Sequence, residues 1–261
     1  MMTWAQFPFF AVAAAVLWVG GAATAWLGGC RVRLSLGLTG AGLLVMSAFI
    51  AAFWWGLGRP PLRTLGETRL WYAFFVVLAG WAVYARWHYR WLPSYAALMA
   101  SVFLAMNVWR PEIHDQTLMP ALQSYWFVPH VCVYMLAYAL LGCAFLLAVA
   151  DWAGRPWRYL PAADRLVYVG TAFLTLGMLS GALWAKEAWG HYWSWDPKET
   201  WAAVTWCLYV GYVHWRLFSP QRGRVVACVL LVAAFLCLQM CWYGVNYLPA
   251  AQGSMHVYAN M

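Results

Sequence analysis

Residues 127–150 read FVPHVCVYMLAYALLGCAFLLAVA, a stretch that contains no Asp, Glu, Lys or Arg. An α-helix rises 1.5 Å per residue, so about 20 apolar residues cross a hydrocarbon layer about 30 Å thick. This stretch is long enough and apolar enough to cross a membrane as one helix. It decides the class of fold, because the surface of a water-soluble domain does not accommodate a run of this length without charge.

Seven further apolar runs lie on the two sides of this one. They fall near residues 8–28, 35–56, 70–86, 91–109, 167–185, 199–217 and 225–244. The sequence therefore predicts an all-α, polytopic integral membrane protein with about eight transmembrane helices. An even number of crossings places both termini on the same side of the membrane.

Composition excludes several classes of protein. The 261 residues are 65% hydrophobic and 9% charged, whereas soluble domains are about 45–50% apolar and about 25% charged. A water-soluble enzyme and a disordered chain are therefore ruled out. The net charge of +8 comes from basic residues scattered along the chain, so we predict no nucleic-acid partner.

The basic residues are divided unequally between the two sets of connections. One set holds Arg31, Arg33, Arg86, Arg90, Arg155, Arg158, Arg165, Arg216, Arg222 and Arg224, with only Asp151 and Asp164 against them. The positive-inside rule makes this set cytoplasmic. Both termini, the 110–126 loop, the 186–198 loop and the C-terminal tail are then expected on the outer side.

A dense group of aromatic residues lies in the loop between the sixth and seventh runs, which reads WGHYWSWDPKETW over residues 189–201. Trp189, Tyr192, Trp193 and Trp195 place four large rings close together. One explanation is an aromatic belt at the membrane interface. The other is a flat, π-rich surface for a flat apolar ligand such as a porphyrin. Belt residues come singly or in pairs, so the density favours the ligand.

The end of this loop also carries the signature of a helix start. Asp196 is a good N-cap, Pro197 suits the first helical position, and Glu199 stands where a capping-box partner would. Asp196 therefore either begins the seventh helix or belongs to a ligand site, and the sequence leaves both explanations open.

A haem would need axial ligands, and histidine is a common one. The predicted topology places His130, which opens the fifth helix, and His256, in the tail, on the same side as the tryptophans. His214 lies about 18 residues beyond Asp196, or roughly 27 Å along the seventh helix. An ionisable group at that depth is a functional candidate; the alternative is a neutral histidine bonded to a neighbouring helix. We expect His114 to be a solvated loop residue.

The aromatic loop is also a recognisable motif. Residues 189–199, WGHYWSWDPKE, resemble the tryptophan-rich WWD signature of haem-handling cytochrome c assembly proteins, and the form WGxYWxWDPKE resembles the CcsA (ResC) type of System II. Further segments agree with that family in order and spacing, namely 120–126 running into His130, 181–185, 214–216, 243–247 and 256–259.

The resemblance covers residues 117–261, whereas residues 1–116 match only in hydropathy. We therefore expect two domains. Residues 1–116 would form N-terminal transmembrane helices with about four spans, and residues 117–261 a cytochrome c assembly (WWD) domain with about four more.

In that family two external histidines ligate haem beside the WWD loop, and an intramembrane histidine belongs to a second, inner haem site. The resemblance thus implies that His130 and His256 bind the iron of haem b at the outer site and that His214 serves the inner one. The residues expected around the porphyrin are Trp189, Tyr192, Trp193, Trp195 and Asp196. No side chain is expected to act as a catalytic acid or base.

The resemblance implies a haem-binding subunit of a cytochrome c haem lyase, or holocytochrome c synthase. It would take haem across the membrane and present it to apocytochrome c, together with a CcsB (ResB)-type membrane subunit, with a thiol-reducing protein as a further candidate partner. The membrane would be the bacterial inner membrane or the thylakoid. Two alternatives stay open: a haem exporter of the CcmC kind without ligation activity, and a haem-binding regulatory membrane protein.

Overall fold

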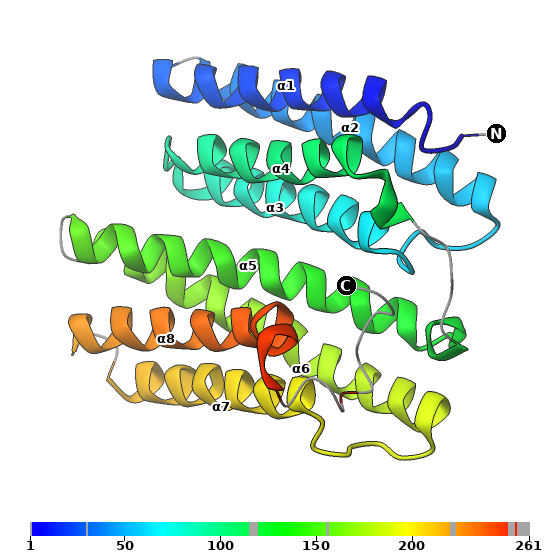
Figure 1. Ribbon diagram of the computed structural model, residues 1–261. Helices are drawn as coiled ribbons and strands as arrows, with labels where there is room; N and C mark the ends of the chain where they lie inside the picture. The colour runs from blue at the N-terminus through cyan, green and yellow to red at the C-terminus, as the bar shows by residue number, and fades with distance from the viewer. Residues whose placement is uncertain are drawn as a thin grey trace. The chain divides into compact units, whose positions relative to one another are not determined.

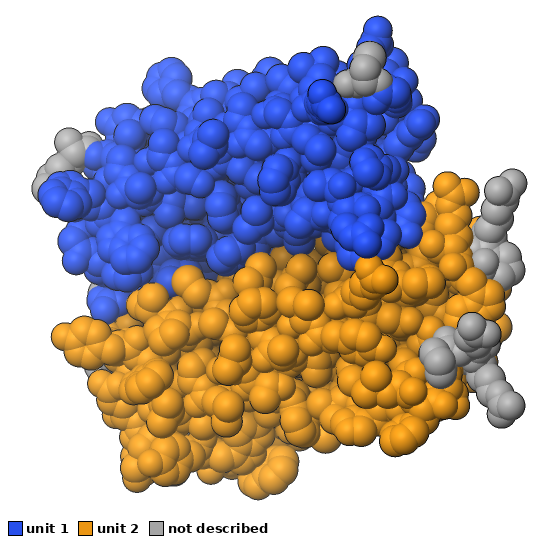
Figure 2. Space-filling model, turned by 180° about the vertical axis from the view of Figure 1, so that it is seen from behind, with its two compact units in different colours: residues 1–117 blue, residues 118–261 orange. Residues whose placement is uncertain are grey.

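The computed structural model describes residues 2–29, 31–114, 120–154, 157–219, 223–249 and 254. Over these residues the chain forms eight α-helices and three short 3-10 helices (Figure 1). The chain divides into two compact units, residues 1–117 and 118–261, which Figure 2 shows in different colours. Each unit contains four of the α-helices and is described by itself.

Unit 1 is a ring of four helices. They are α1 (Phe7–Leu27), α2 (Arg31–Leu57), α3 (Leu65–Trp87) and α4 (Leu92–Trp109), followed by the 3-10 helix η1 (Pro111–His114). Each α-helix packs against the next along the chain, and α4 returns to α1. Glycines allow the close approach that helices need in lipid. A Cβ atom at Gly42 would lie 2.5 Å from Nε1 of Trp18, and one at Gly80 would lie 2.7 Å from Cβ of Ala96.

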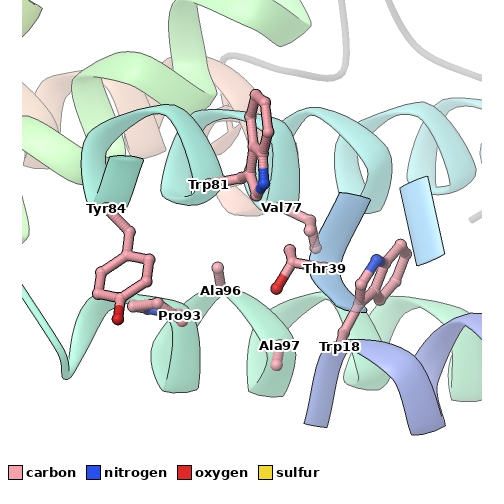
Figure 3. A pocket seen from close by; sticks show the side chains of 8 residues that line it. All are labelled: Trp18, Thr39, Val77, Trp81, Tyr84, Pro93, Ala96 and Ala97. Carbon is pink, nitrogen blue, oxygen red and sulfur yellow. The ribbon is translucent and has the colours of Figure 1, made fainter. Parts of the chain in front are cut away.

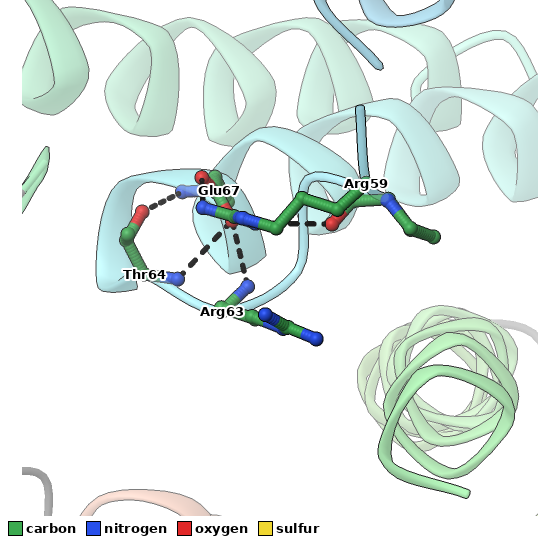
Figure 4. Close-up of polar contacts among 5 residues, drawn as sticks. Arg59, Arg63, Thr64 and Glu67 are labelled. Atoms are coloured by element: carbon green, nitrogen blue, oxygen red, sulfur yellow. Dashed lines mark hydrogen bonds and ion pairs between the residues drawn. The ribbon is translucent and has the colours of Figure 1, made fainter. Parts of the chain in front are cut away.

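A buried carboxylate lies in the first turn of α3 (Figure 4). Glu67 is fully buried and accepts two hydrogen bonds of 2.9 Å from the guanidinium of Arg59. It also accepts from the backbone N–H groups of Arg63, at 2.7 Å, and Thr64, at 3.2 Å. The Thr64 hydroxyl accepts in turn from the N–H of Glu67 at 3.1 Å, which completes a capping box. The carboxylate of Glu67 is thus satisfied inside the unit.

His114 is half-buried, so the expectation of a solvated loop residue is wrong. Its ring stacks on that of Trp4, with centroids 3.9 Å apart, and its Nε2 lies 3.2 Å from Oδ1 of Asn107. Gly66 leaves the space, since a Cβ there would lie 2.5 Å from the imidazole. Burial lowers the pKa of His114. The acidic neighbours in the sequence suggested solvent, but the ring packs on Trp4 inside the unit.

A small cavity lies between the helices of unit 1 (Figure 3). Trp18, Thr39, Tyr84 and Pro93, one from each helix, are among the side chains that line it. Its volume is about 10 Å³, which accommodates about one water molecule. This cavity is therefore far too small for a porphyrin.

Unit 2 is a second ring of four helices. They are α5 (Phe127–Ala153), α6 (Leu160–Trp189), α7 (Pro197–Phe218) and α8 (Arg224–Trp242), with the 3-10 helices η2 (Pro120–Gln123) and η3 (Gly244–Tyr247). The helix α5 packs against α6 and α8, and α7 packs against the same two. The antiparallel order brings the start of α5, the end of α6 and the start of α7 to one end of this unit (Figure 1).

Seven of the eight described α-helices are long and apolar enough to cross a membrane, and the all-α polytopic prediction is confirmed. The exception by hydropathy is α7, although its 22 residues are enough to cross. Two of its polar residues find partners on α6: Arg216 makes hydrogen bonds of 3.0 and 2.7 Å to the carboxylate of Asp164, and the Tyr212 hydroxyl donates to the same group at 2.5 Å. Part of the polarity of α7 is therefore accommodated by packing inside unit 2.

The end of unit 2 where α5 ends and α6 begins holds a second buried carboxylate besides that of Asp164. Asp151, at the end of α5, is fully buried and pairs with the Arg224 guanidinium at 2.9 Å. It also accepts from the backbone N–H groups of Tyr159, at 2.8 Å, and Leu160, at 3.2 Å, where α6 begins. One side chain thus joins the ends of three helices.

We predict that Glu67→Ala destabilises the protein by about 3–5 kcal/mol, because it leaves the Arg59 charge buried without its partner and removes the capping box. The measurement is thermal or denaturant unfolding of detergent-purified protein. The control is Glu112→Ala, since Glu112 is exposed and pairs with Arg110 at the surface; it should leave the unfolding midpoint unchanged. Equal midpoints for the two variants would contradict the prediction.

Candidate functional site

The ring of His130 is held in one tautomer. This residue lies in the first turn of α5, and its Nδ1 is 2.8 Å from the backbone oxygen of Gly177 on α6. A carbonyl oxygen only accepts, so Nδ1 carries the hydrogen and Nε2 has the lone pair. Metal-binding histidines commonly have this arrangement, in which the ring nitrogen that does not bind the metal donates to a carbonyl or carboxylate. The chain therefore orients His130 so that Nε2 is the atom able to bind a metal.

Two glycines on α6 make room for the rings of His130 and Tyr134. A Cβ atom at Gly181 would lie 2.6 Å from both Nδ1 and Cε1 of His130, and one at Gly177 would lie 3.0 Å from the ring of Tyr134. Gly177 and Gly181 are four residues apart, which puts both on the same face of the helix. This is the small-xxx-small spacing that lets membrane helices approach closely. The spacing is visible in the sequence, but its partner is not.

Aromatic rings surround His130. The ring of Trp184 stacks on it, with centroids 5.3 Å apart, and Tyr134 meets it edge-on at 4.7 Å. Trp184 in turn contacts Trp189 at 4.8 Å, and its Nε1 donates to the backbone oxygen of Ala121 in η2 at 2.7 Å. Trp184 lay in a segment that the sequence comparison singled out, but its contact with the histidine was not foreseen. It connects His130 to the aromatic loop.

The loop after α6 begins at Gly190, whose positive φ of 86° ends that helix. Trp193 and Trp195 then meet edge to face, with centroids 5.7 Å apart. Trp195 is 70% exposed, and Tyr192 is also exposed. Nε1 of Trp193 is buried and has no hydrogen-bond partner among the described residues. The loop thus combines exposed flat rings with one buried donor that has no acceptor in the described part of the chain.

Asp196 is the N-cap of α7, as one of the two sequence explanations had it. Its Oδ1 accepts from the backbone N–H of Lys198 at 2.9 Å. Glu199 completes the capping box by accepting from the N–H groups of Asp196, at 3.1 Å, and Ser194, at 2.8 Å. The same Oδ1 also accepts from the hydroxyl of Ser254 at 3.1 Å, a contact the sequence did not indicate.

His214 lies near the other end of α7 and is exposed on the surface of unit 2. Its Nδ1 is 2.8 Å from the backbone oxygen of Val210 in its own helix, so Nδ1 donates and Nε2 has the lone pair. The ring does not bond a neighbouring helix in the described part of the chain, contrary to the alternative drawn from the sequence. The structure therefore separates His214 from the aromatic group around His130.

His256 lies outside the described residues. Among those that are described, no three His, Cys, Asp or Glu side chains gather in a way that could hold a metal ion. A haem iron with two axial protein ligands does not need such a cluster, since the porphyrin supplies the other four.

The fold and the site define a class: a polytopic helical membrane protein with an oriented histidine beside an aromatic loop. A family model described as "Cytochrome C assembly protein" matches residues 7–251. The chain is 34% identical to the cytochrome c biogenesis protein CcsA of Chlamydomonas reinhardtii over 80% of this chain and 64% of that protein. It is 30% identical to CcsA of Synechococcus sp. strain JA-2-3B'a(2-13) over 81% of each. The chain belongs to the CcsA group of the cytochrome c assembly protein family.

The match of the family model starts in α1, so it also includes unit 1, where the sequence motifs showed only hydropathy. A solved structure of the cytochrome c haem lyase CcmF has a similar fold, with a TM-score of 0.64 and 21% sequence identity. That likeness covers 90% of this chain and 46% of CcmF. This chain thus spans less than half of CcmF and about two thirds of the algal CcsA.

We predict that Gly181→Ala destabilises unit 2 by about 1–3 kcal/mol, because the added methyl group overpacks the contact between α6 and His130. The control is Gly37→Ala in α2, where a Cβ meets nothing within 4 Å; it should be neutral or stabilising, since alanine favours a helix. Unfolding midpoints in detergent compare the two variants. A Gly181→Ala protein as stable as the unmodified one would show that the ring is not held against this helix.

Proposed function

We propose that this chain is the haem-handling subunit of a cytochrome c haem lyase, which takes haem across the membrane and presents it for covalent attachment to apocytochrome c. The chain is a membrane protein of the cytochrome c assembly family. The observation that carries the proposal is His130, whose ring donates to Gly177 and has Nε2 as its ligand atom, next to the aromatic loop.

The outer site would be built from His130 and His256 as the two axial ligands of haem b. Trp189, Tyr192, Trp193 and Trp195 would offer flat apolar surface to the porphyrin. The exposed rings of Tyr192 and Trp195 are features that a bound ligand would cover. It would also satisfy the buried Nε1 of Trp193, for which the described residues provide no acceptor. These features fit a planar molecule with an apolar body and acceptor groups at its edge.

The chemistry at this site would need orientation more than acid–base catalysis. Each apocytochrome thiol would add across a vinyl group, its sulfur bonding one carbon and its hydrogen ending on the other. The haem carries that reactivity, and the protein contributes position and proximity. The apocytochrome histidine would then replace one of the two axial histidines. A thiol-reducing partner would keep the apocytochrome cysteines reduced.

The inner site would use His214. Its exposure on unit 2, with Nδ1 bonded to its own helix, leaves the ligand atom facing away from that helix backbone. A second ligand would come from a membrane partner of CcsB type. Haem would pass from this site to the outer one.

The orientation follows from charge. The end of unit 2 that holds Asp151 and Asp164 would face the cytoplasm, with both of these carboxylates paired to arginines inside the unit. The aromatic loop and both termini would then lie on the periplasmic or lumenal side of a bacterial inner membrane or a thylakoid.

We predict that the purified protein carries haem with a six-coordinate, low-spin, bis-histidine absorption spectrum. His130→Ala or His256→Ala should lose this signature, and added imidazole should partly restore it by filling the vacated position. His88→Asn is the control, because it removes an imidazole at a left-handed position that asparagine tolerates. If both alanine variants keep the low-spin spectrum, the outer-site assignment is wrong.

We predict that His214→Ala empties both sites in protein expressed with its CcsB-type partner, because haem would reach the outer site only through the inner one. Its unfolding midpoint should hardly change, since the ring makes no hydrogen bond to another helix in the described chain. The measurement is haem stoichiometry on monodisperse protein, with imidazole added to refill the vacated space. Full occupancy of the outer site in this variant would exclude the proposed passage of haem from the inner site to the outer one.

Thioether formation in a reconstituted system separates this function from its alternatives. A haem exporter of the CcmC kind would deliver haem without forming the bond. A regulatory haem-binding protein would not complement a strain that lacks cytochrome c assembly.

A further inference from the structure

Asp196 has one more partner than a helix cap requires. Its Oδ1 accepts from the N–H of Lys198, which is the capping bond, and also from the hydroxyl of Ser254 at 3.1 Å. Ser254 is 58 positions further along the chain, beyond α8 and η3. The contact therefore ties the C-terminal tail to the first turn of α7.

The other capping box in this chain shows what capping alone needs. At the start of α3 the cap is a hydroxyl, that of Thr64, and its hydrogen bond from the chain is the one from the N–H of Glu67. Serine, threonine, asparagine and aspartate cap about equally well. A carboxylate at position 196 is thus not needed to begin the helix. What it adds is acceptor capacity, and the Ser254 hydroxyl uses that capacity.

The surroundings of Asp196 make it a firm anchor. Its side chain is 6% exposed, and it lies at a helix N-terminus, where the backbone dipoles favour a negative charge. The last turn of α8 is joined to the same place, because the Cys241 thiol donates to the backbone oxygen of Lys198 at 3.4 Å. The start of α7, the end of α8 and the tail at Ser254 therefore meet around one carboxylate.

We propose that Asp196 is a positioning residue, which holds Ser254 and thereby places His256 for its role as an axial ligand. This inference rests on the function proposed above. Ser254 precedes His256 by two residues, and two residues of extended chain reach at most about 7 Å. A hydrogen bond at Ser254 thus anchors the chain two residues before the proposed ligand. Asp196 acts on the haem through this tether and not as a ligand.

Ser254→Ala tests the tether, because it removes the donor and leaves the cap intact. We expect haem to remain bound through His130 while the low-spin fraction falls and a five-coordinate, high-spin species grows. The concentration of imidazole needed to restore the low-spin spectrum reports the loss. A hydrogen bond to a charged group changes such an equilibrium roughly tenfold or more. Ser254→Thr, which keeps the hydroxyl, should behave like the unmodified protein.

Asp196→Ser is the complementary variant. A serine hydroxyl caps α7, as that of Thr64 caps α3, but its oxygen lies one bond closer to the backbone than Oδ1 of Asp196 and carries no charge, so it does not replace Oδ1 as the acceptor for Ser254. It should show the same spectrum as Ser254→Ala, and the double variant should show no further change, because both substitutions break one bond. Thr24→Val is the control, since among the described residues the Thr24 hydroxyl bonds carbonyls of its own helix, α1, in unit 1. It should leave the spectrum unchanged.

A measurement on the haem-free protein tests the hydrogen bond between Ser254 and Asp196 independently of the proposed function. Hydrogen–deuterium exchange of the peptide that covers residues 248–258, in the haem-free protein, should be faster in Ser254→Ala and in Asp196→Ser. If the protein binds no haem but this exchange responds, the function fails and the tether stands. If haem is bound as proposed but neither the spectrum nor the exchange responds to Ser254→Ala, the tether is overturned and Asp196 is only a cap.

Discussion

Hydrocarbon offers no hydrogen-bond partner, so every polar group that a helix carries into a membrane has to be satisfied by the protein itself. Most of the polar architecture here follows from this constraint. Glu67, Asp151 and Asp164 are each met by an arginine and by further donors from the chain. Each of these carboxylates lies at or near a helix end; Glu67 and Asp151 also accept from backbone N–H groups, and Asp151 and Asp164 join segments that are distant along the chain.

The same constraint shapes the candidate site. The N–H group of an imidazole between two membrane helices needs a hydrogen-bond acceptor, and for His130 this is the backbone oxygen of Gly177. The glycines at 177 and 181 bring α6 close enough for this bond, because a side chain at position 181 would occupy the space of the ring. Once Nδ1 is committed in this way, Nε2 is the only nitrogen able to bind a metal. Helix packing thus decides the chemistry of His130.

The sequence predicted most of the helices closely, and the misplaced starts of α3 and α6 share one cause. The run at 127–150 corresponds to α5, and that at 199–217 to α7, within a few residues. The third run was placed at 70–86, but α3 begins at Leu65, since Glu67 is buried by its ion pair. The sixth was placed at 167–185, but α6 begins at Leu160, with Asp164 inside it. A hydropathy pattern predicts that a span ends at a charged residue, because it contains no information about an ion-pair partner elsewhere in the fold.

The sequence by itself determined the class of the protein, the eight helices and the family motif in the aromatic loop, and it gave a helix cap as one of two explanations for Asp196. These are local properties, because span length, cap chemistry and motif all depend on neighbours along the chain. Only the tertiary structure decided the tautomer of His130, the stacking of Trp184 on it, the burial of His114 and the bond from Ser254 to Asp196. Each of these depends on which helix faces which and how closely, a distance that glycines and paired charges on separate helices set together.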